Sequence, residues 1–111
     1  MVIGDIIRNR IGFDGLLMTD DIDMKALSGS AGDKAAGAIA AGCDLVLDCW
    51  GRMNEMEDIA ERLGAMSELS RARLERAMAT VAGVKGEGDF AALVAKRDAL
   101  LALAAGSAPV A

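Results

Sequence analysis

A short apolar run that ends in carboxylates is the feature that most constrains this chain. Residues 12–27 have the sequence GFDGLLMTDDIDMKAL, in which two glycines bracket a turn and Leu16–Met18 form the run. An apolar run without polar alternation is typical of a strand buried on both faces of a parallel sheet. Asp20 and Asp21 follow the predicted strand 16–19 at its carboxyl end, the edge at which α/β folds carry their chemistry. The pattern predicts a catalytic site at these two acids, with the plainer alternative that they end a strand or cap a helix.

The same pattern occurs a second time further along the chain. Residues 44–49 have an aspartate, an apolar run and a second aspartate, and they predict another strand. Parallel strands need a crossover of about a dozen residues or more, and residues 20–43 provide one. Two successive strand–helix units of an α/β protein follow. Because a two-stranded sheet leaves its edges unpaired and is rarely stable alone, we expect the chain to be a piece of a larger fold.

Apolar residues at helical spacing predict helices around these strands. Asp33 and Asn54 are the expected caps of two of them, and either Ser67 or Ser70 is expected to begin a third. Three arginines on that third helix are interpreted as a solvated face rather than a binding patch. The predicted helices cover residues 2–10, 34–41, 55–65, 68–82 and 89–104, and the arginines are Arg71, Arg73 and Arg76. The residues predicted to face inward on the helices 55–65 and 68–82 are Met56, Ile59, Ala60, Leu63, Leu69, Leu74, Ala77, Met78 and Val81. Residues 106–111 are expected to be disordered.

Composition and charge exclude several classes of protein. The chain has 111 residues and a net charge of −5, which argues against nucleic acid as a partner because phosphate binding needs a basic face. No residue run is apolar enough for a membrane span, and no signal peptide is expected at the start. Cys43 and Cys49 flank a predicted strand, too far apart to pair, so they are interpreted as reduced thiols of a cytoplasmic protein. Without histidine, a metal site built on two lone cysteines is not expected.

The motif resembles a known family of enzymes. Residues 11–21, IGFDGLLMTDD, are similar to the nucleophile segment of bacterial β-N-acetylhexosaminidases of glycoside hydrolase family 3. Residues 20–24, DDIDM, also fit, with Asp23 where serine is frequent in the family. Residues 40–44, AAGCD, resemble the segment that follows. The resemblance extends from about residue 2 to about residue 80.

This resemblance implies a fold and a chemistry. The fold would be a (β/α)8 barrel, of which residues 1–83 would form the carboxyl-terminal part, the last two strand–helix units and closing helices, with residues 84–111 as a helical tail. Asp20 would be the nucleophile of a retaining hydrolysis of terminal β-linked N-acetylhexosamine, from cell-wall muropeptides or chitooligosaccharides, and no cofactor is required. Asp21 and Asp23 would support Asp20 by hydrogen bonding or by their charge, or would be helix-start acids.

The sequence also departs from the family. The family's acid/base histidine lies on an upstream loop, and this chain has no histidine and no segment similar to that loop. We therefore expect the chain alone to be catalytically silent. Two other interpretations stay open: an α/β module that binds Mg²⁺ through Asp20, Asp21 and Asp23, and a non-catalytic domain that self-associates through its incomplete sheet.

Overall fold

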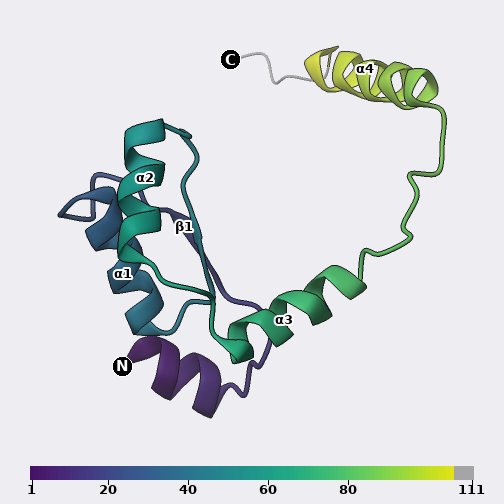
Figure 1. Ribbon diagram of the computed structural model, residues 1–111. Helices are drawn as coiled ribbons and strands as arrows, with labels where there is room; N and C mark the ends of the chain where they lie inside the picture. The colour runs from purple at the N-terminus through teal and green to yellow at the C-terminus, as the bar shows by residue number, and fades with distance from the viewer. Residues whose placement is uncertain (107–111) are drawn as a thin grey trace.

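The computed structural model describes residues 1–106 of the chain (Figure 1). The order of helices and strands agrees with the predicted order. The disorder predicted for residues 106–111 falls mainly on residues 107–111, which lie outside the described part. In chain order the elements are the π-helix η1 (Val2–Arg10), strand β1 (Met18–Asp21), helix α1 (Ala31–Ala41), strand β2 (Leu45–Leu47), and helices α2 (Met53–Arg62), α3 (Glu68–Ala79) and α4 (Phe90–Gly106).

Helix α1 begins three residues before the predicted start, because Ser30 and not Asp33 is its N-cap. The Asp33 N–H donates to Ser30 Oγ (3.2 Å), and the Ser30 N–H donates to Asp33 Oδ2 (3.3 Å). This reciprocal pair, a capping box, satisfies two backbone donors that a helix start otherwise leaves free. Gly42 ends the helix with φ 115°, a conformation that favours glycine.

The predicted N-caps of the next two helices, α2 and α3, have different outcomes. The expectation for Asn54 is wrong, because α2 starts at Met53 and its N-cap, Arg52, makes no side-chain cap hydrogen bond. Ser67, one of the two predicted alternatives, caps α3: its Oγ accepts the N–H of Ser70 at 3.1 Å. The long arginine-bearing helix therefore begins where its sequence indicates.

Strands β1 and β2 form a parallel two-stranded sheet, as predicted. β1 lies two residues beyond the predicted range 16–19, because its pairing with β2 decides where it begins. The Leu17 carbonyl accepts the N–H of Leu45 at 3.2 Å, and Met18 is the register partner of Leu45. As a result, the two adjacent acids of the motif belong to the strand itself instead of following it.

The core lies where α1 and α2 pack on each other beside the sheet. Ile22 and Ala35 are 2% and 0% exposed. Gly32 lets the two helices approach closely, since a Cβ there would lie 2.7 Å from the Asp58 carbonyl oxygen. The core extends no further along the later helices. Of the nine residues that were predicted to face inward on α2 and on the helix 68–82, four are half-buried, and five are exposed instead: Met56, Ala60, Leu69, Met78 and Val81.

The chain is more open than a compact domain of its length. Its radius of gyration is 20.0 Å, against about 13 Å expected for a compact domain. Its accessible surface is 8466 Å², against about 5,800 Å² for a compact protein of this mass. Figure 1 shows α3 leading away from the pair α1–α2, and α4 standing apart at the end of an extended connection.

The α/β class is confirmed in its coarse form, helices with a parallel two-stranded sheet. The more specific prediction, that these elements form the carboxyl-terminal part of a barrel, stays a prediction. Among residues 1–106, no helix has the length and apolar character needed to cross a membrane.

Candidate active site

The carboxyl ends of β1 and β2 bring the predicted site residues together. Asp20 and Asp21 are the last two residues of β1, and Asp23 follows in the adjoining loop. Asp21 Oδ1 accepts two hydrogen bonds, from the N–H of Asp23 at 3.1 Å and from the N–H of Cys49 at 3.3 Å. Because Cys49 lies just beyond β2, Asp21 ties the ends of the two strands to each other and to the loop.

Asp20 is the exposed carboxylate at this edge. Its neighbours Thr19 and Asp21 are half-buried. Asp20 Oδ1 accepts the Asp21 N–H at 2.8 Å, and within residues 1–106 its Oδ2 has no hydrogen-bond partner. Below it, Thr19 Oγ1 accepts the N–H of Leu47 at 2.9 Å, which fixes the two strands to each other. An accessible carboxylate with one free oxygen on a fixed strand end meets the geometric needs of a nucleophile.

A cation and an aromatic ring stand beside the acids. Arg52 Nη2 lies 3.7 Å from Asp23 Oδ2, and Arg52 Nη1 donates to Glu55 Oε1 at 2.8 Å. The same guanidinium lies 5.3 Å from the centroid of the exposed Trp50 ring, within range of a cation–π interaction. The hydrogen bond and charge of Glu55 raise the pKa of Arg52. The edge therefore offers carboxylates, a permanent positive charge and an apolar ring side by side.

Asp48 borders a small polar cavity between the end of β2 and the start of α1. The cavity has a volume of about 170 Å³, and Asp23, Lys34 and Glu55 also line it. Asp48 Oδ1 accepts the N–H of Trp50 at 3.4 Å, but its buried Oδ2 has no hydrogen-bond partner in residues 1–106. An unpaired buried oxygen is costly, and a cavity of this size has room for a water molecule that would donate to it.

The acids of the motif are not gathered around a metal position. Asp20, Asp21 and Asp23 are joined in series through backbone N–H groups. In the described part of the chain, no group of three or more His, Cys, Asp or Glu side chains is placed to hold a metal ion. The magnesium interpretation therefore has no geometric support there.

The two cysteines are free thiols, and they do not pair with each other. Partial desolvation, together with the charge of Asp21, raises the pKa of the Cys49 thiol. Cys49 is accordingly protonated at neutral pH, and a protonated thiol is a poor nucleophile.

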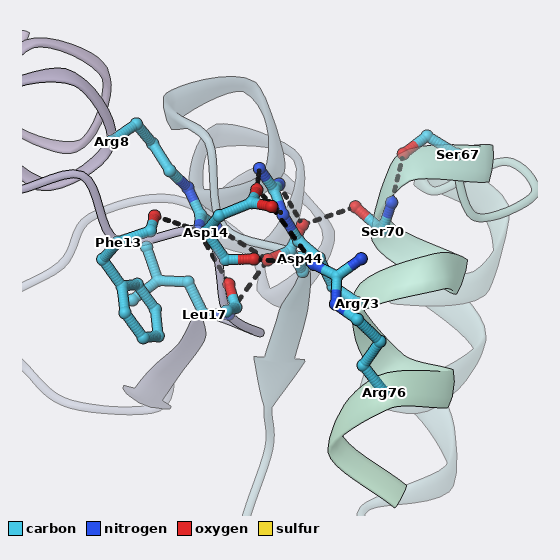
Figure 2. Close-up of polar contacts among 10 residues, drawn as sticks. Arg8, Phe13, Asp14, Leu17, Asp44, Ser67, Ser70, Arg73 and Arg76 are labelled. Carbon is cyan, nitrogen blue, oxygen red and sulfur yellow. Dashed lines mark hydrogen bonds and ion pairs between the residues drawn. The ribbon is translucent and has the colours of Figure 1, made fainter. Parts of the chain in front are cut away.

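A second cluster, which the sequence did not reveal, lies at the opposite, amino ends of the strands (Figure 2). At its centre Asp44 is only 5% exposed. Asp44 Oδ2 accepts hydrogen bonds from Arg8 Nη2 (2.8 Å) and from the Leu17 N–H (2.9 Å). Asp44 Oδ1 accepts from Ser70 Oγ (2.6 Å) and from Arg73 Nη1 (3.0 Å). Burial alone would raise the pKa of Asp44, but the donors on Ser70, Leu17 and Arg73 outweigh it and hold that pKa below its usual value.

The interpretation of Arg73 as part of a solvated face is therefore wrong. Its side chain is 11% exposed, and it bridges Asp44 to Asp14, with Arg73 Nη2 2.9 Å from Asp14 Oδ1. Arg76 also pairs with Asp14, at 3.3 Å. Arg71 and Arg76 both keep the exposed position that was predicted for all three, although Arg76 also contacts Asp14. The available signal was the spacing of three between Arg73 and Arg76, which puts both on one face of a helix.

Comparison with known proteins identifies the family of this chain. Residues 1–84 match the model of the glycosyl hydrolase family 3 N-terminal domain. A beta-hexosaminidase of Chromobacterium violaceum is 36% identical over 103 residues, which are 91% of this chain and 28% of that relative. The beta-hexosaminidases of Bordetella avium and Thioalkalivibrio sulfidiphilus are 41% and 38% identical, over 55% and 63% of this chain and 18% and 21% of their own lengths.

The chain belongs to the glycosyl hydrolase family 3 N-terminal domain family. The resemblance of its motif to bacterial hexosaminidases of that family is thereby confirmed. The chain spans less than a third of the length of the curated relatives it matches. No solved structure matches it.

Proposed function

We propose that this chain supplies the nucleophile of a β-N-acetylhexosaminidase and that Asp20 is the attacking carboxylate. The observation that carries the proposal is the exposed Asp20 on the fixed end of β1. It stands in a motif similar to the nucleophile segment of the family to which the chain belongs. In the complete protein, the substrate would be a terminal β-linked N-acetylhexosamine of a muropeptide or chitooligosaccharide, and the reaction needs no metal or organic cofactor.

The mechanism that we propose is a retaining one. The Asp20 carboxylate attacks the anomeric carbon, the bond to the leaving-group oxygen breaks, and water later hydrolyses the glycosyl ester. The hydrogen bond from the Asp21 N–H occupies Oδ1 and leaves Oδ2 free to attack. Asp21 and Asp23 act as positioning residues in this proposal: Asp21 holds the strand ends together, and Asp23 faces Arg52.

A retaining mechanism also needs a group that protonates the leaving-group oxygen. The chain contains no histidine, and no residue of it is assigned this role. We infer that residues 1–83 form the last two strand–helix units of a (β/α)8 barrel, with residues 84–111 as a helical tail, and that the proton donor comes from another part of the complete enzyme. The free thiols agree with a cytoplasmic location.

The first test uses the purified chain and a chromogenic β-N-acetylglucosaminide, beside the variant Asp20→Asn. We expect no turnover from either protein, because the proton donor is missing. If the chain turns over the substrate and Asp20→Asn abolishes that turnover, the result would support Asp20 as the nucleophile but contradict the expectation that the chain alone is catalytically silent. Turnover that survives in Asp20→Asn would contradict the nucleophile itself.

A chimera tests the nucleophile directly. This chain would replace the matching 103-residue segment of the Chromobacterium violaceum relative, which supplies the rest of the protein. We expect the chimera to hydrolyse the chromogenic substrate and Asp20→Asn to lower its kcat by at least about a thousandfold. The control variant Asp23→Asn, three residues further along the chain, should lower the kcat of the chimera far less. An active chimera in which Asp20→Asn keeps its kcat refutes the proposal.

The exposed apolar surface favours a second property, self-association. The accessible surface exceeds that of a compact protein of this mass by roughly 2,700 Å², a large excess beside the area that stable interfaces bury. We expect light scattering on the purified chain to give a mass above that of one copy. A monomer over a wide concentration range would contradict this property without bearing on Asp20.

A further inference from the structure

Helix α3 is attached to the rest of the chain mainly by polar side chains. No residue of α3 is buried: Leu69 and Met78 are exposed, and Leu74 is half-buried. By contrast, Ser70 and Arg73 both donate to Asp44, at 2.6 and 3.0 Å. A helix that packs through an apolar stripe would show the opposite distribution.

The acceptors of these contacts belong to the amino ends of both strands. Asp44 directly precedes β2, and Asp14 lies in the turn before β1. Arg73 reaches both carboxylates, and Arg76 Nη2 also donates to the Asp14 carbonyl at 2.9 Å. The charged face of α3 therefore spans the starts of the two strands (Figure 2).

The same carboxylates also face groups from the other elements. Arg8 of η1 pairs with Asp44 and donates to the carbonyl of Gly15 at 2.7 Å, and the Leu17 N–H donates to Asp44 from the start of β1. The neighbouring thiol of Cys43 has a raised pKa, through burial and the charge of Asp44, and stays neutral. Removing a donor on α3 thus leaves Asp44 paired with Arg8, whereas removing the Asp44 charge affects η1 and the strands as well.

We propose that Ser70, Arg73 and Arg76 form a polar clasp on Asp44 and Asp14 that holds α3 against the sheet, and that breaking these contacts from the α3 side releases the helix while α1, α2 and the strands stay folded. This inference concerns how the fold is held together and does not rest on the proposed function. A released α3 has only 12 residues, too few for a stable isolated helix in water. Release is therefore observable as unfolding of α3 by itself.

The electrostatics support release by acid. The hydrogen bond from Arg73, together with the charges of the surrounding arginines, holds the pKa of Asp14 below its usual value, and the pKa of Asp44 is also lowered. Groups with a lowered folded pKa stabilise the closed state above their unfolded pKa and lose that effect as the pH falls through the folded pKa. The clasp is therefore closed at neutral pH, and it weakens as the pH falls through the lowered pKa values of Asp14 and Asp44.

Amide hydrogen exchange of the full chain at neutral pH tests the clasp. In Arg73→Met, we expect protection of the α3 amides to fall on the order of a hundredfold while protection of α1 changes little. Arg71→Met is the matched control, because Arg71 is exposed on the same helix and pairs with Glu68. It should leave α3 protection within about threefold of the unchanged chain. Loss of protection in α3 and α1 together, or no loss in Arg73→Met, overturns the proposal.

Two further measurements separate the clasp from a general loss of stability. Ser70→Ala removes one donor and keeps both arginines, so α3 protection should fall by about tenfold, in α3 only. In an acid titration followed by amide NMR signals, the α3 signals should reach their unfolded positions at a higher pH than the α1 signals. A single acid transition shared by both helices would overturn the inference even if every variant folds.

Discussion

Replacing Asp44 by asparagine removes the charge at the centre of the polar network and keeps the shape of the side chain. The carboxylate accepts four hydrogen bonds, two through each oxygen. An asparagine amide keeps one accepting oxygen and turns N–H groups towards the other pair of donors. Whichever way it is oriented, either Arg8 with the Leu17 N–H or Arg73 with Ser70 loses its acceptor. Breaking a buried ion pair by removing one partner costs about 3–5 kcal/mol.

This cost is large for a chain with so small a core. Domains are typically stable by about 5–15 kcal/mol, and only a few apolar side chains are buried here. Urea unfolding followed by circular dichroism should therefore show Asp44→Asn losing about 3–5 kcal/mol. Glu68→Gln, which removes an exposed ion pair with Arg71, should cost under about 1 kcal/mol. If the two variants lose similar, small amounts, the buried network does not stabilise the fold as argued.

Three other predictions address packing, acid and thiol reactivity. Gly32→Ala should lower the free energy of unfolding by about 1–3 kcal/mol, because its Cβ would lie 2.7 Å from a backbone carbonyl oxygen of α2. A Cβ at Gly37 on the same helix meets no atom, so Gly37→Ala should raise the free energy of unfolding by about 0.5–1 kcal/mol. Equal urea midpoints for the two variants would contradict this. Because the pKa of Asp44 is lowered in the folded chain, its stabilisation is complete above the unfolded value of about 3.9 and is lost as the pH falls through the folded pKa; a urea midpoint that rises in acid would contradict this sign. Asp21→Asn should speed alkylation of Cys49 at neutral pH, because it removes a charge that raises the pKa of the Cys49 thiol. The rate is measured by mass spectrometry with Cys43 as the reference. An unchanged rate would mean that the contact between Asp21 and Cys49 does not affect the thiol.

The sequence predicted those features that depend on local chemistry. The order of elements, the parallel pair of strands and the cap at Ser67 follow from periodicity, crossover length and side-chain type. The gathering of Asp20, Asp21 and Asp23 at one strand end follows from adjacency. That Asp20 is the nucleophile stays a prediction.

The features that the sequence did not predict depend on partners far along the chain. The position of β1 is set by pairing with β2 and not by the apolar run that precedes it. Arg73 meets Asp14, 59 residues away, and Asp44, 29 residues away. On a helical wheel it is one charged residue among several, and charge runs are usually solvated. Only the folded structure shows that Asp14 and Asp44 lie within contact distance of Arg73.

Two features of the chain, exposed apolar residues on α3 and the lack of histidine, support the proposal that other polypeptide completes the fold and the site. Leu69 and Met78 stand in a helical pattern of apolar residues, yet both are exposed in the described part of the chain. Asp20, the proposed nucleophile, likewise lies at a strand end in a chain that contains no histidine. If α3 packed only against this chain, polar residues would be expected at the positions that are exposed to solvent. The curated relatives are more than three times as long as the matched segment, so both features agree with a fold and a site completed by other polypeptide.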